Sequence, residues 1–464
     1  MTIPADVKNI HFIGIGGYGM SALALILLQK GYTVSGSDIK DSALTENLVS
    51  NGATVMIGHS AENLGDTQLV VYSTAIDPDN PELLETHRRG LPLWHRSELL
   101  ASLLNSAYGI AIAGTHGKTT TTAMVALLLE AGGLDPTAVI GGVLPAYGSN
   151  ARLGTSNYLV AEADESDNSF NRYHPRMVLV TGIEPDHLEH YKNNYELLRQ
   201  AYETFLAHLH PDGKAIICVE EPGLPELTSR LDRAIITYAR TNNSAARPDY
   251  YADHIKLTGS GSSFDIYYRG TLKATNITLN VPGSHNISNA VGALALADQL
   301  KVDLISAAPA LSAFTGVGRR FEHIGTINEI TVIDDYAHHP TEIKATLQAA
   351  RLSGRRIICI FQPHRHTRTA GFFEEFARSF CDADRLLLHS IYPAGEKPIP
   401  GITSEALAAK IECNNDIPVF YSPDINILEE KAVQLARPGD LIITMGAGDI
   451  TASARRIYQL LSAR

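Results

Sequence analysis

The chain has few of the features that mark disulfide-rich, membrane or secreted proteins. Its four cysteines form no CxxC pair, so their spacing indicates neither a zinc site nor a disulfide framework, and buried free thiols are expected. No apolar run approaches the roughly 18 residues of a membrane-spanning helix. The N-terminal segment MTIPADVKNIHFIGIGG lacks the basic and apolar regions of a signal peptide, so a cytoplasmic, reducing compartment is expected.

Positive charge is also scarce. The 38 lysines and arginines are outnumbered by 50 acidic residues, which gives a formal net charge of −12 at pH 7. Such a surface repels polyanions, so a nucleic-acid partner is not expected, and any phosphate must be bound by local donors. No segment repeats with a period of about 20 to 50 residues, which excludes a solenoid. The 464 residues instead predict about three globular domains.

Strand-like and helix-like patterns alternate in three blocks. The first opens with a β run, a Gly-rich turn, an apolar helix and a second β run that ends at Asp38, which is a βαβ unit. A second unit begins at YGIAIAGTHGKTT, and residues 250–281 alternate as antiparallel hairpins do. A third block starts at ITVIDD. We predict an α/β fold with Rossmann-like domains at 1–106 and 323–464, and at 107–322 a central domain with a parallel sheet plus a small antiparallel sheet.

A Gly-rich turn between a predicted strand and a predicted helix is the most informative motif. Residues 114–120 read GTHGKTT, where backbone N–H groups and the helix dipole would bind phosphate. Lys118 would reach the β- and γ-phosphates, and Thr119 would place its hydroxyl on Mg²⁺. Ile112 replaces the first glycine of the full pattern, and the alternative is an exposed turn with a solvated lysine. We predict a central P-loop ATPase domain that binds ATP through Gly114, Thr115, His116, Gly117, Lys118, Thr119 and Thr120.

A second Gly-rich turn lies in the first block, where Gly14, Gly16 and Gly19 fit G-x-G-x-x-G. Asp38 ends the next predicted strand, as in a dinucleotide-binding domain. The pattern suits any tight turn of a doubly wound domain, and a UDP diphosphate would fit it as well as NAD. A nicotinamide-dependent oxidoreductase and a non-catalytic nucleotide-binding regulator are therefore alternative functions, although both leave the central motifs unused.

Polar groups follow several predicted strands. Residues 162–167 read EADESD, and Asp186 with His187 closes the run RMVLVTGIEPDH. These groups either hold Mg²⁺ at the phosphate edge of the sheet or form a solvated acidic loop. Residues 283–289 either cap an Ala-rich helix or face a nucleotide base, and the arginines at 319–320 and 365–368 suit anion recognition. His338 and His339 are adjacent and point to opposite sides, which favours substrate contact over shared metal binding.

Nine segments together resemble the Mur ligase family in order and spacing along nearly the whole chain: HFIGIGGYGM, GTHGKTTTTAM, EADESDNSF, IEPDHLEHY, GSHNISNA, GRRFE, DDYAHHPTEI, FQPHRHTRT and GAGDI. The pattern is most similar to members that join L-alanine to UDP-N-acetylmuramate, and less similar to a ligase that recycles murein tripeptide. The resemblance implies an ADP-forming ligase of peptidoglycan synthesis that uses ATP and Mg²⁺ and proceeds through an acyl phosphate. A monomer or homodimer is expected, with no membrane or nucleic-acid partner.

The resemblance also implies roles for individual residues. Its catalytic set is Lys118, Glu165, His187, His338, Arg365 and Arg368, and its metal ligands are Thr119, Glu165 and His187. Nucleotide contacts extend to His285, Asn286, Asn289 and Arg320. The UDP-sugar would meet Gly14, Gly16, Gly17, Gly19, Asp38 and Ser73, with Tyr336, His338, Arg365 and Arg368 at the muramoyl or alanyl end. Gly182 departs from the expected Asn, and Tyr202 and its neighbours offer no lysine like the carbamoylated one of several sister ligases.

Overall fold

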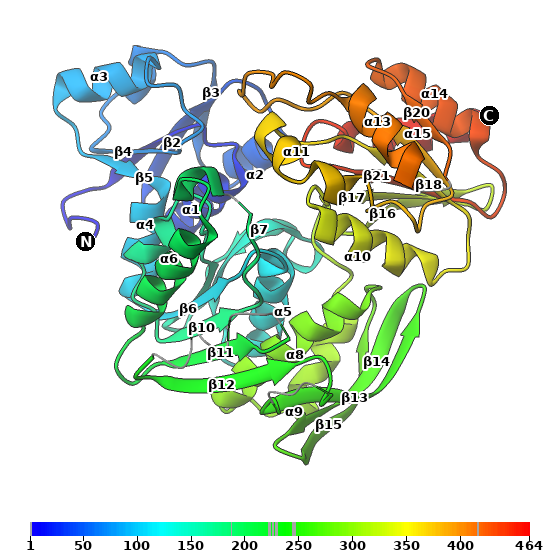
Figure 1. Ribbon diagram of the computed structural model, residues 1–464. Helices are drawn as coiled ribbons and strands as arrows, with labels where there is room; N and C mark the ends of the chain where they lie inside the picture. Colours follow the sequence, from blue (N-terminus) through cyan, green and yellow to red (C-terminus); the bar gives the residue numbers. More distant parts are fainter. Residues whose placement is uncertain are drawn as a thin grey trace. The chain divides into compact units, whose positions relative to one another are not determined.

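The computed structural model describes residues 2–186, 188–220, 224, 227, 231–243, 247–414 and 417–464. It contains three β-sheets, each packed against helices (Figure 1). The α/β class with three domains that the sequence predicts is confirmed, whereas the domain boundaries at 106 and 322 stay predictions. The backbone forms two compact units, one of Met1–His254, Phe264–Ile277 and Ser288–Phe314, and one of Ile255–Ser263, Thr278–Ile287 and Thr315–Arg464.

The N-terminal sheet has five parallel strands in the order β3-β2-β1-β4-β5. The apolar side chains of its central strands β1 and β4 are buried, as expected for a parallel sheet covered by helices on both faces. Because the chain leaves β1 toward β2 and later returns to its other side, the turn after β1 lies at a switch point. The elements are β1 (Asn9–Ile13), α1 (Tyr18–Gln29), β2 (Thr33–Asp38), α2 (Ala43–Ser50), β3 (Thr54–Ile57), η1 (Ala61–Leu64), β4 (Leu69–Tyr72), α3 (Pro81–Arg89), β5 (Leu93–His95) and α4 (Arg96–Asn105).

A fully buried carboxylate links these strands and helices. Glu82 of α3 and His11 of β1 are both 0% exposed, and His11 Nε2 lies 3.2 Å from Glu82 Oε2. Ser37 Oγ donates to the same oxygen at 2.6 Å, and Asn63 Nδ2 donates to Oε1 at 2.6 Å. Burial raises the pKa of Glu82, but the hydrogen bonds from His11, Ser37 and Asn63 outweigh it and lower the pKa to about 2. Glu82 is therefore an ionised, hydrogen-bonded core residue of the N-terminal sheet.

The central sheet has ten strands in the order β15-β14-β13-β12-β11-β10-β6-β9-β7-β8. Strands β7, β9, β6, β10, β11, β12 and β13 pair in parallel, and β8 is antiparallel to β7. The chain passes from β6 to β7 and then inserts β9 between them, so the turn after β6 lies at a second switch point. The strands are β6 (Tyr108–Ala113), β7 (Thr137–Leu144), β8 (Ser149–Arg152), β9 (Tyr158–Glu162), β10 (Met177–Val180), β11 (Lys214–Cys218), β12 (Ala234–Ala239), β13 (Tyr250–Thr258), β14 (Gly261–Tyr268) and β15 (Thr271–Leu279).

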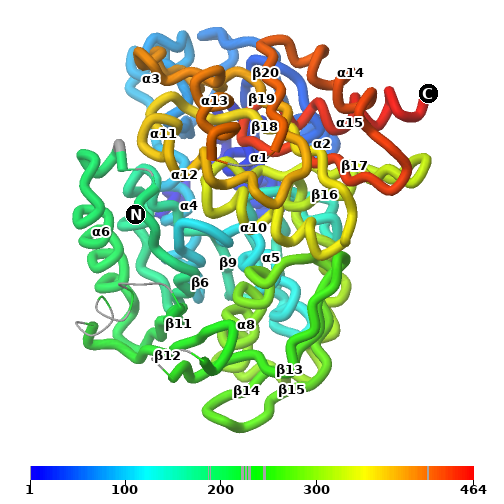
Figure 2. Tube along the Cα trace, turned by 45° about the vertical axis from the view of Figure 1, so that its right-hand side comes forward, coloured from blue at the N-terminus to red at the C-terminus, as the bar shows by residue number. Residues whose placement is uncertain are grey.

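The predicted antiparallel hairpins are β13, β14 and β15, which extend one edge of the central sheet (Figure 2). Helix α5 follows the turn after β6 and has a fully apolar buried core from Ala123 to Leu129. The described helical elements of this part are α5 (Lys118–Ala131), η2 (Pro145–Tyr147), η3 (Ser169–Arg172), η4 (Leu188–Tyr191), α6 (Tyr195–Ala207), α8 (Ser284–Gln299), α9 (Leu304–Ala307) and η5 (Ala308–Ala313).

The hairpin of β7 and β8 joins the central sheet to helix α1 of the N-terminal part. Strand β8 packs along α1, and Asn150 Nδ2 donates to Tyr18 O at 2.6 Å and to Ser21 Oγ at 3.0 Å. At the other end of the helix, Leu153 N donates to Gln29 Oε1 at 3.1 Å. The helix is therefore attached at both of its ends, and the N-terminal sheet and strands β6 to β12 of the central sheet belong to one compact unit.

The C-terminal sheet has six strands in the order β16-β17-β21-β18-β19-β20, and only the pair β16–β17 is antiparallel. Alternate side chains face opposite layers: Ile333 and Cys359 pack with α10, α12 and α13, whereas Val332 and Ile358 pack with α14 and α15. The elements are β16 (Glu322–Ile327), β17 (Ile330–Asp335), α10 (Pro340–Arg351), β18 (Ile357–Phe361), α11 (His366–Gly371), α12 (Phe373–Phe376), β19 (Arg385–Leu388), α13 (Ser404–Asn414), β20 (Val419–Tyr421), α14 (Ile425–Leu435), β21 (Leu441–Met445) and α15 (Thr451–Ser462).

The cysteines follow the prediction in part. All four are free, and Cys218 and Cys359 are buried. The expectation of burial is wrong for Cys381 and Cys413, which are exposed. Cys413 lies two positions after the buried Ile411 of α13, and two helical positions turn a side chain to the opposite face.

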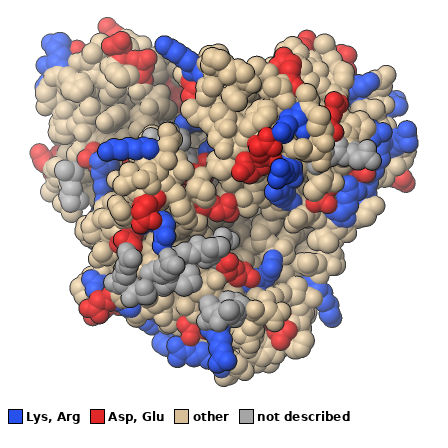
Figure 3. All heavy atoms as spheres, in the orientation of Figure 1, with Lys and Arg blue, Asp and Glu red and all other residues tan. Residues whose placement is uncertain are grey.

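The surface agrees with the mixed composition of the sequence. Figure 3 shows acidic and basic side chains interspersed over one face of the molecule. Among the described helices, none is both long enough and apolar enough to cross a bilayer.

Candidate functional site

Close backbone contacts fix the turn between β6 and α5. Gly114 has φ +130°, and a Cβ there would lie 3.0 Å from the N and O atoms of Gly182, so only glycine fits. Thr115 N donates to Gly182 O at 2.9 Å, and Glu184 N donates to Thr115 Oγ1 at 2.8 Å. The predicted phosphate-binding turn is therefore held against the segment after β10. Gly182, which departs from the expected Asn, contributes a backbone contact there.

Lys118, the first residue of α5, points back into this turn. Its Nζ donates to Gly114 O at 2.6 Å and to the two Glu165 carboxylate oxygens at 3.0 and 2.8 Å. Glu165 is 1% exposed. Burial alone would lower the pKa of Lys118, but attraction to Glu165 and Asp164 outweighs it and raises that pKa. Lys118 is therefore a charged, positioned cation, which contradicts the alternative of a solvated lysine.

A carboxylate that the sequence analysis did not single out lies beside Thr119. Glu162 is the last residue of β9 and accepts a hydrogen bond from Gly141 N at 2.6 Å. It also accepts one from the Thr119 hydroxyl, and burial raises its pKa despite these bonds and the nearby Lys118. A Cβ on Gly141 would lie 2.6 Å from Glu162 Oε1, so the close approach needs glycine. The sequence analysis placed Glu162 in the run 162–167 after an apolar strand but did not name it among the metal ligands.

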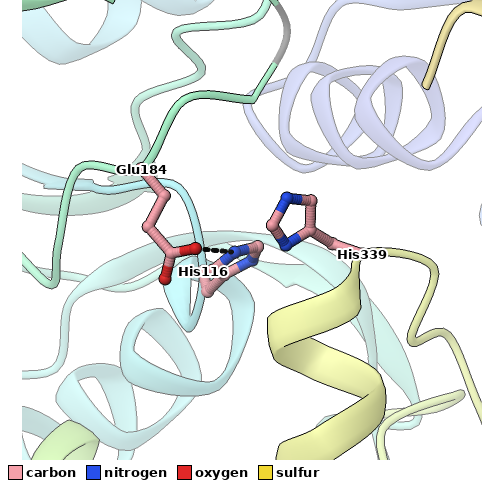
Figure 4. Close-up of side chains that lie close together, drawn as sticks. All are labelled: His116, Glu184 and His339. Atoms are coloured by element: carbon pink, nitrogen blue, oxygen red, sulfur yellow. Dashed lines mark ion pairs between the residues drawn. The ribbon is translucent and has the colours of Figure 1, made fainter. Parts of the chain in front are cut away.

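The segment after β10 brings a further acidic residue to the turn. Glu184 Oε2 lies 3.6 Å from His116 Nε2, and Figure 4 shows this ion pair. The expectation that Asp186 ends a β run is wrong, because β10 ends at Val180 and Asp186 lies in the irregular segment beyond it, where it is buried. His187 lies outside the described residues, so its predicted role as a metal ligand is not tested.

Helix α8 contributes one of the predicted nucleotide residues to the same turn. Gly117 has φ +80°, and a Cβ there would lie 2.6 Å from Asn289 Oδ1. Asn289 is 8% exposed, so its amide lies directly against the phosphate-binding turn. Asn286 Nδ2 instead donates to Pro282 O at 2.7 Å and fixes the start of α8. Asn286 thus has a structural contact, whereas the nucleotide contact of Asn289 stays a prediction.

Asp38 stabilises the Gly-rich turn of the N-terminal sheet. Gly16 N donates to Asp38 Oδ2 at 2.8 Å, and Gly14 N donates to Ser37 O at 2.8 Å. Gly14 has φ +78°, a conformation that favours glycine. Ser73 follows β4 at the same edge of the sheet. The structure therefore brings the predicted UDP-sugar residues to one sheet edge, with Asp38 bonded to the turn.

The C-terminal unit gathers the predicted residues around Tyr336. Its ring lies 4.7 Å from the Arg319 guanidinium and 5.2 Å from that of Arg320. Arg320 Nη1 donates to Glu342 Oε1 at 3.2 Å, and His338 N donates to Glu342 Oε2 at 3.1 Å. These cations and aromatic faces form a surface suited to an anion.

The arginine loop after β18 belongs to the same unit. Arg368 is 7% exposed, and its Nη1 lies 3.3 Å from His364 Nδ1. The His364 ring is 5.9 Å from that of His338 in an edge-to-face arrangement. Arg365 has φ +69°, which is a strained conformation for a non-glycine residue. The structure thus joins the two C-terminal motifs that the sequence predicts to contact substrate.

Family models match most of the chain. The Mur ligase family catalytic domain matches residues 9–108, the Mur ligase middle domain matches residues 112–297, and the Mur ligase glutamate ligase domain matches residues 319–448.

Individual proteins match over the full length. The chain is 48% identical to a UDP-N-acetylmuramate–L-alanine ligase of Pelotomaculum thermopropionicum, with 98% of both chains covered. It is 46% identical to the protein of the same name from Sorangium cellulosum, covering 99% of this chain and 97% of that one. The crystal structure of a UDP-N-acetylmuramate-alanine ligase from Thermotoga maritima superposes with a TM-score of 0.83 at 31% identity, covering 98% and 99% of the two chains. This chain belongs to the Mur ligase family.

Proposed function

We propose that the protein joins L-alanine to UDP-N-acetylmuramate and converts ATP to ADP and phosphate. The observation that carries this proposal is the turn after β6, where Lys118, Thr119 and Glu162 meet at the switch point of a parallel sheet. Such a site suits a nucleoside triphosphate. The full-length relatives that bear this activity in their names support the choice of substrates.

The chain's own groups suit phosphoryl transfer to a carboxylate. Lys118 offers a fixed positive charge to the β- and γ-phosphates, and the start of α5 offers backbone N–H groups. The γ-phosphoryl group passes to the lactoyl carboxylate, and the alanine amine then attacks the acyl phosphate and releases phosphate. Positioning and charge neutralisation are the main contributions of the protein, because an amine beside an acyl phosphate needs little further activation.

Oxygen donors beside the turn fit Mg²⁺. Thr119 and Glu162 are hydrogen-bonded to one another, and hydroxyl and carboxylate oxygens are ligands that Mg²⁺ prefers. Bound there, Mg²⁺ would neutralise charge on the transferring phosphoryl group. We propose Thr119 and Glu162 as ligands, with Glu165 and His187 as the further ligands that the family resemblance implies.

Glutamine variants at 162 and 165 separate the two carboxylates. Glu162→Gln should raise the Mg²⁺ concentration for half-maximal activity by about tenfold to a hundredfold, as expected when a ligand shell is weakened. Glu165→Gln should raise the KM for ATP as well as the Mg²⁺ requirement, because Lys118 Nζ donates to both carboxylate oxygens of this proposed ligand. Titration of ADP release with Mg²⁺ and with ATP checks both expectations. Equal Mg²⁺ curves for Glu162→Gln and the unaltered protein would remove Glu162 from the metal site.

A labelled-substrate assay tests the reaction as a whole. UDP-N-acetylmuramate carrying ¹⁸O in its lactoyl carboxylate is incubated with ATP and one amino acid, which is L-alanine, glycine or L-serine in separate reactions. The masses of the products are measured by mass spectrometry. We expect ADP release to depend on L-alanine and one ¹⁸O atom to appear in inorganic phosphate. If AMP is the nucleotide product, the acyl-phosphate route is wrong. If ATP is hydrolysed independently of any amino acid, the proposed ligase activity is wrong.

The remaining features of the proposal follow from the substrates. The Gly-rich turn after β1 would take the UDP diphosphate, and the C-terminal cluster around Tyr336 would meet the muramoyl or alanyl end.

We propose the cytoplasm as the compartment, which four free cysteines support, and a monomer or homodimer as the working form.

A further inference from the structure

A short segment after β19 contacts the arginine loop, although no sequence motif marks it. Tyr392 N donates to Pro363 O at 2.8 Å, and Arg365 N donates to Tyr392 O at 2.8 Å. The Tyr392 ring stacks on the His364 ring at 5.6 Å with an interplanar angle of 8°. Residues 392–396, which we call the 392–396 turn, therefore lie against the residues on either side of Pro363.

Glu396, the last residue of the 392–396 turn, accepts hydrogen bonds from the same arginine loop. Glu396 accepts hydrogen bonds from Thr367 N at 3.0 Å and from Thr367 Oγ1 at 2.7 Å. Helix α11 begins at His366, so the Glu396 carboxylate acts as a cap for the first turn of that helix. Glu396 Oε1 also lies 3.8 Å from Arg365 Nη1. One carboxylate thus connects the helix start and the neighbouring guanidinium.

Glu396 is ionised at neutral pH. Its side chain is 19% exposed. Partial burial would raise the pKa of Glu396, but the bonds from Thr367 and the charge of Arg365 outweigh it and lower that pKa. Glu396 therefore presents a negative charge to Arg365 at neutral pH.

Both backbones at this contact adopt uncommon conformations. Arg365 has φ +69° and ψ +138°, a region populated almost only by glycine. Ala394 has φ +48° and Gly395 has φ +84°, and Glu396 N donates to Pro393 O at 2.9 Å to close the turn. Strain of this kind persists only where neighbouring contacts determine the conformation, and it gathers at functional sites. The hydrogen bond from Arg365 N to Tyr392 O and the ion pair of Arg365 with Glu396 are two of the contacts that hold Arg365 here.

We propose that the 392–396 turn positions the guanidinium of Arg365 for a substrate carboxylate, with Glu396 as the positioning residue. The inference rests on the proposed function, in which Arg365 meets the muramoyl or alanyl end. Both substrates present a carboxylate there, and a bidentate arginine contact depends on the direction of the guanidinium plane. Glu396 acts through Arg365 and its loop, and it takes no part in the bond changes.

The kinetic effect of losing Glu396 should be selective. Glu396→Ala should raise the KM of the carboxylate substrate that Arg365 binds by about tenfold, since small errors in positioning are costly, while the KM for ATP stays within about twofold. Glu396→Gln, which keeps the size of the side chain and loses its charge, should give a smaller change in the same direction. Glu430→Gln, an exposed glutamate on α14, is the matched control and should change none of these constants.

A double-mutant cycle separates positioning from a purely structural role. Arg365→Lys keeps the charge but loses the planar fork, so Glu396→Gln should add little to its effect. Additive effects in the double variant, or KM values that rise equally for all three substrates, would overturn the proposal. So would a lowered Tm with unchanged KM values. Absence of alanine-dependent ADP release from the unaltered protein would instead refute the proposed function, so the two failures are distinct.

Discussion

Lys118→Ala should lower the rate of alanine-dependent ADP release by about a hundredfold to a thousandfold. The residue holds a fixed positive charge in the turn after β6, with Nζ 2.6 Å from Gly114 O. Loss of one preorganised group that stabilises developing charge has effects of this size. Binding of UDP-N-acetylmuramate, measured by calorimetry, should stay nearly unchanged, because its predicted turn belongs to the N-terminal sheet.

The control for this change is Lys30→Ala, at an exposed position after α1. It should retain the activity of the unaltered protein. Near-normal turnover by Lys118→Ala would remove the turn after β6 from the catalytic site. A parallel loss of UDP-sugar binding would show instead that the substitution disturbs the fold of the whole unit.

Glu82→Gln should lower the free energy of unfolding of the unit that contains the N-terminal sheet by about 3 kcal/mol at neutral pH. The pKa of this buried carboxyl is lowered from 4.5 to about 2, and each pKa unit corresponds to about 1.4 kcal/mol. Trp94 of β5 is the only tryptophan and is 8% exposed, so its fluorescence in a urea titration reports on this sheet. Glu46→Gln, at an exposed position on α2, should leave the urea midpoint unchanged.

The stability conferred by Glu82 should depend on pH in one direction. A carboxyl whose pKa is lowered by folding contributes stability that is complete above its unfolded pKa and is lost as the pH falls toward the folded value. The free energy of unfolding should therefore differ between the unaltered protein and Glu82→Gln by a constant amount above about pH 5. This difference should become smaller as the pH falls from there to about 2. A difference that is constant down to pH 3 would contradict the assigned ionisation.

The sequence predicted the strand-turn-helix units because glycine turns and apolar periods are local signals. Residues 162–167 carry four carboxylates, and the family resemblance named only Glu165 among them. The folded chain shows that Glu162 faces Thr119 and Glu165 faces Lys118. The alternation of apolar residues gives the face of a strand but not the neighbours across a sheet.

The contacts of the 392–396 turn left no local signal in the sequence. The 392–396 turn acts through backbone bonds and through a carboxylate that caps a helix almost 30 residues earlier in the chain. Asp38 was predicted as a ligand residue from its distance to the Gly-rich turn. In the structure its carboxylate accepts a hydrogen bond from Gly16 N and so stabilises that turn. Contacts between residues far apart in sequence were the part that could not be predicted.

The attachment of α1 at both of its ends has a consequence for inhibitor design. Asn150 and Leu153 bond to opposite ends of this helix, so the Gly-rich turns before α1 and α5 lie in one compact unit at a separation that the fold determines. A stiff linker of matching length between a diphosphate mimic and a nucleotide mimic would therefore place the second group at a high effective concentration once the first is bound. A shorter or more flexible linker would lose most of this increase in effective concentration.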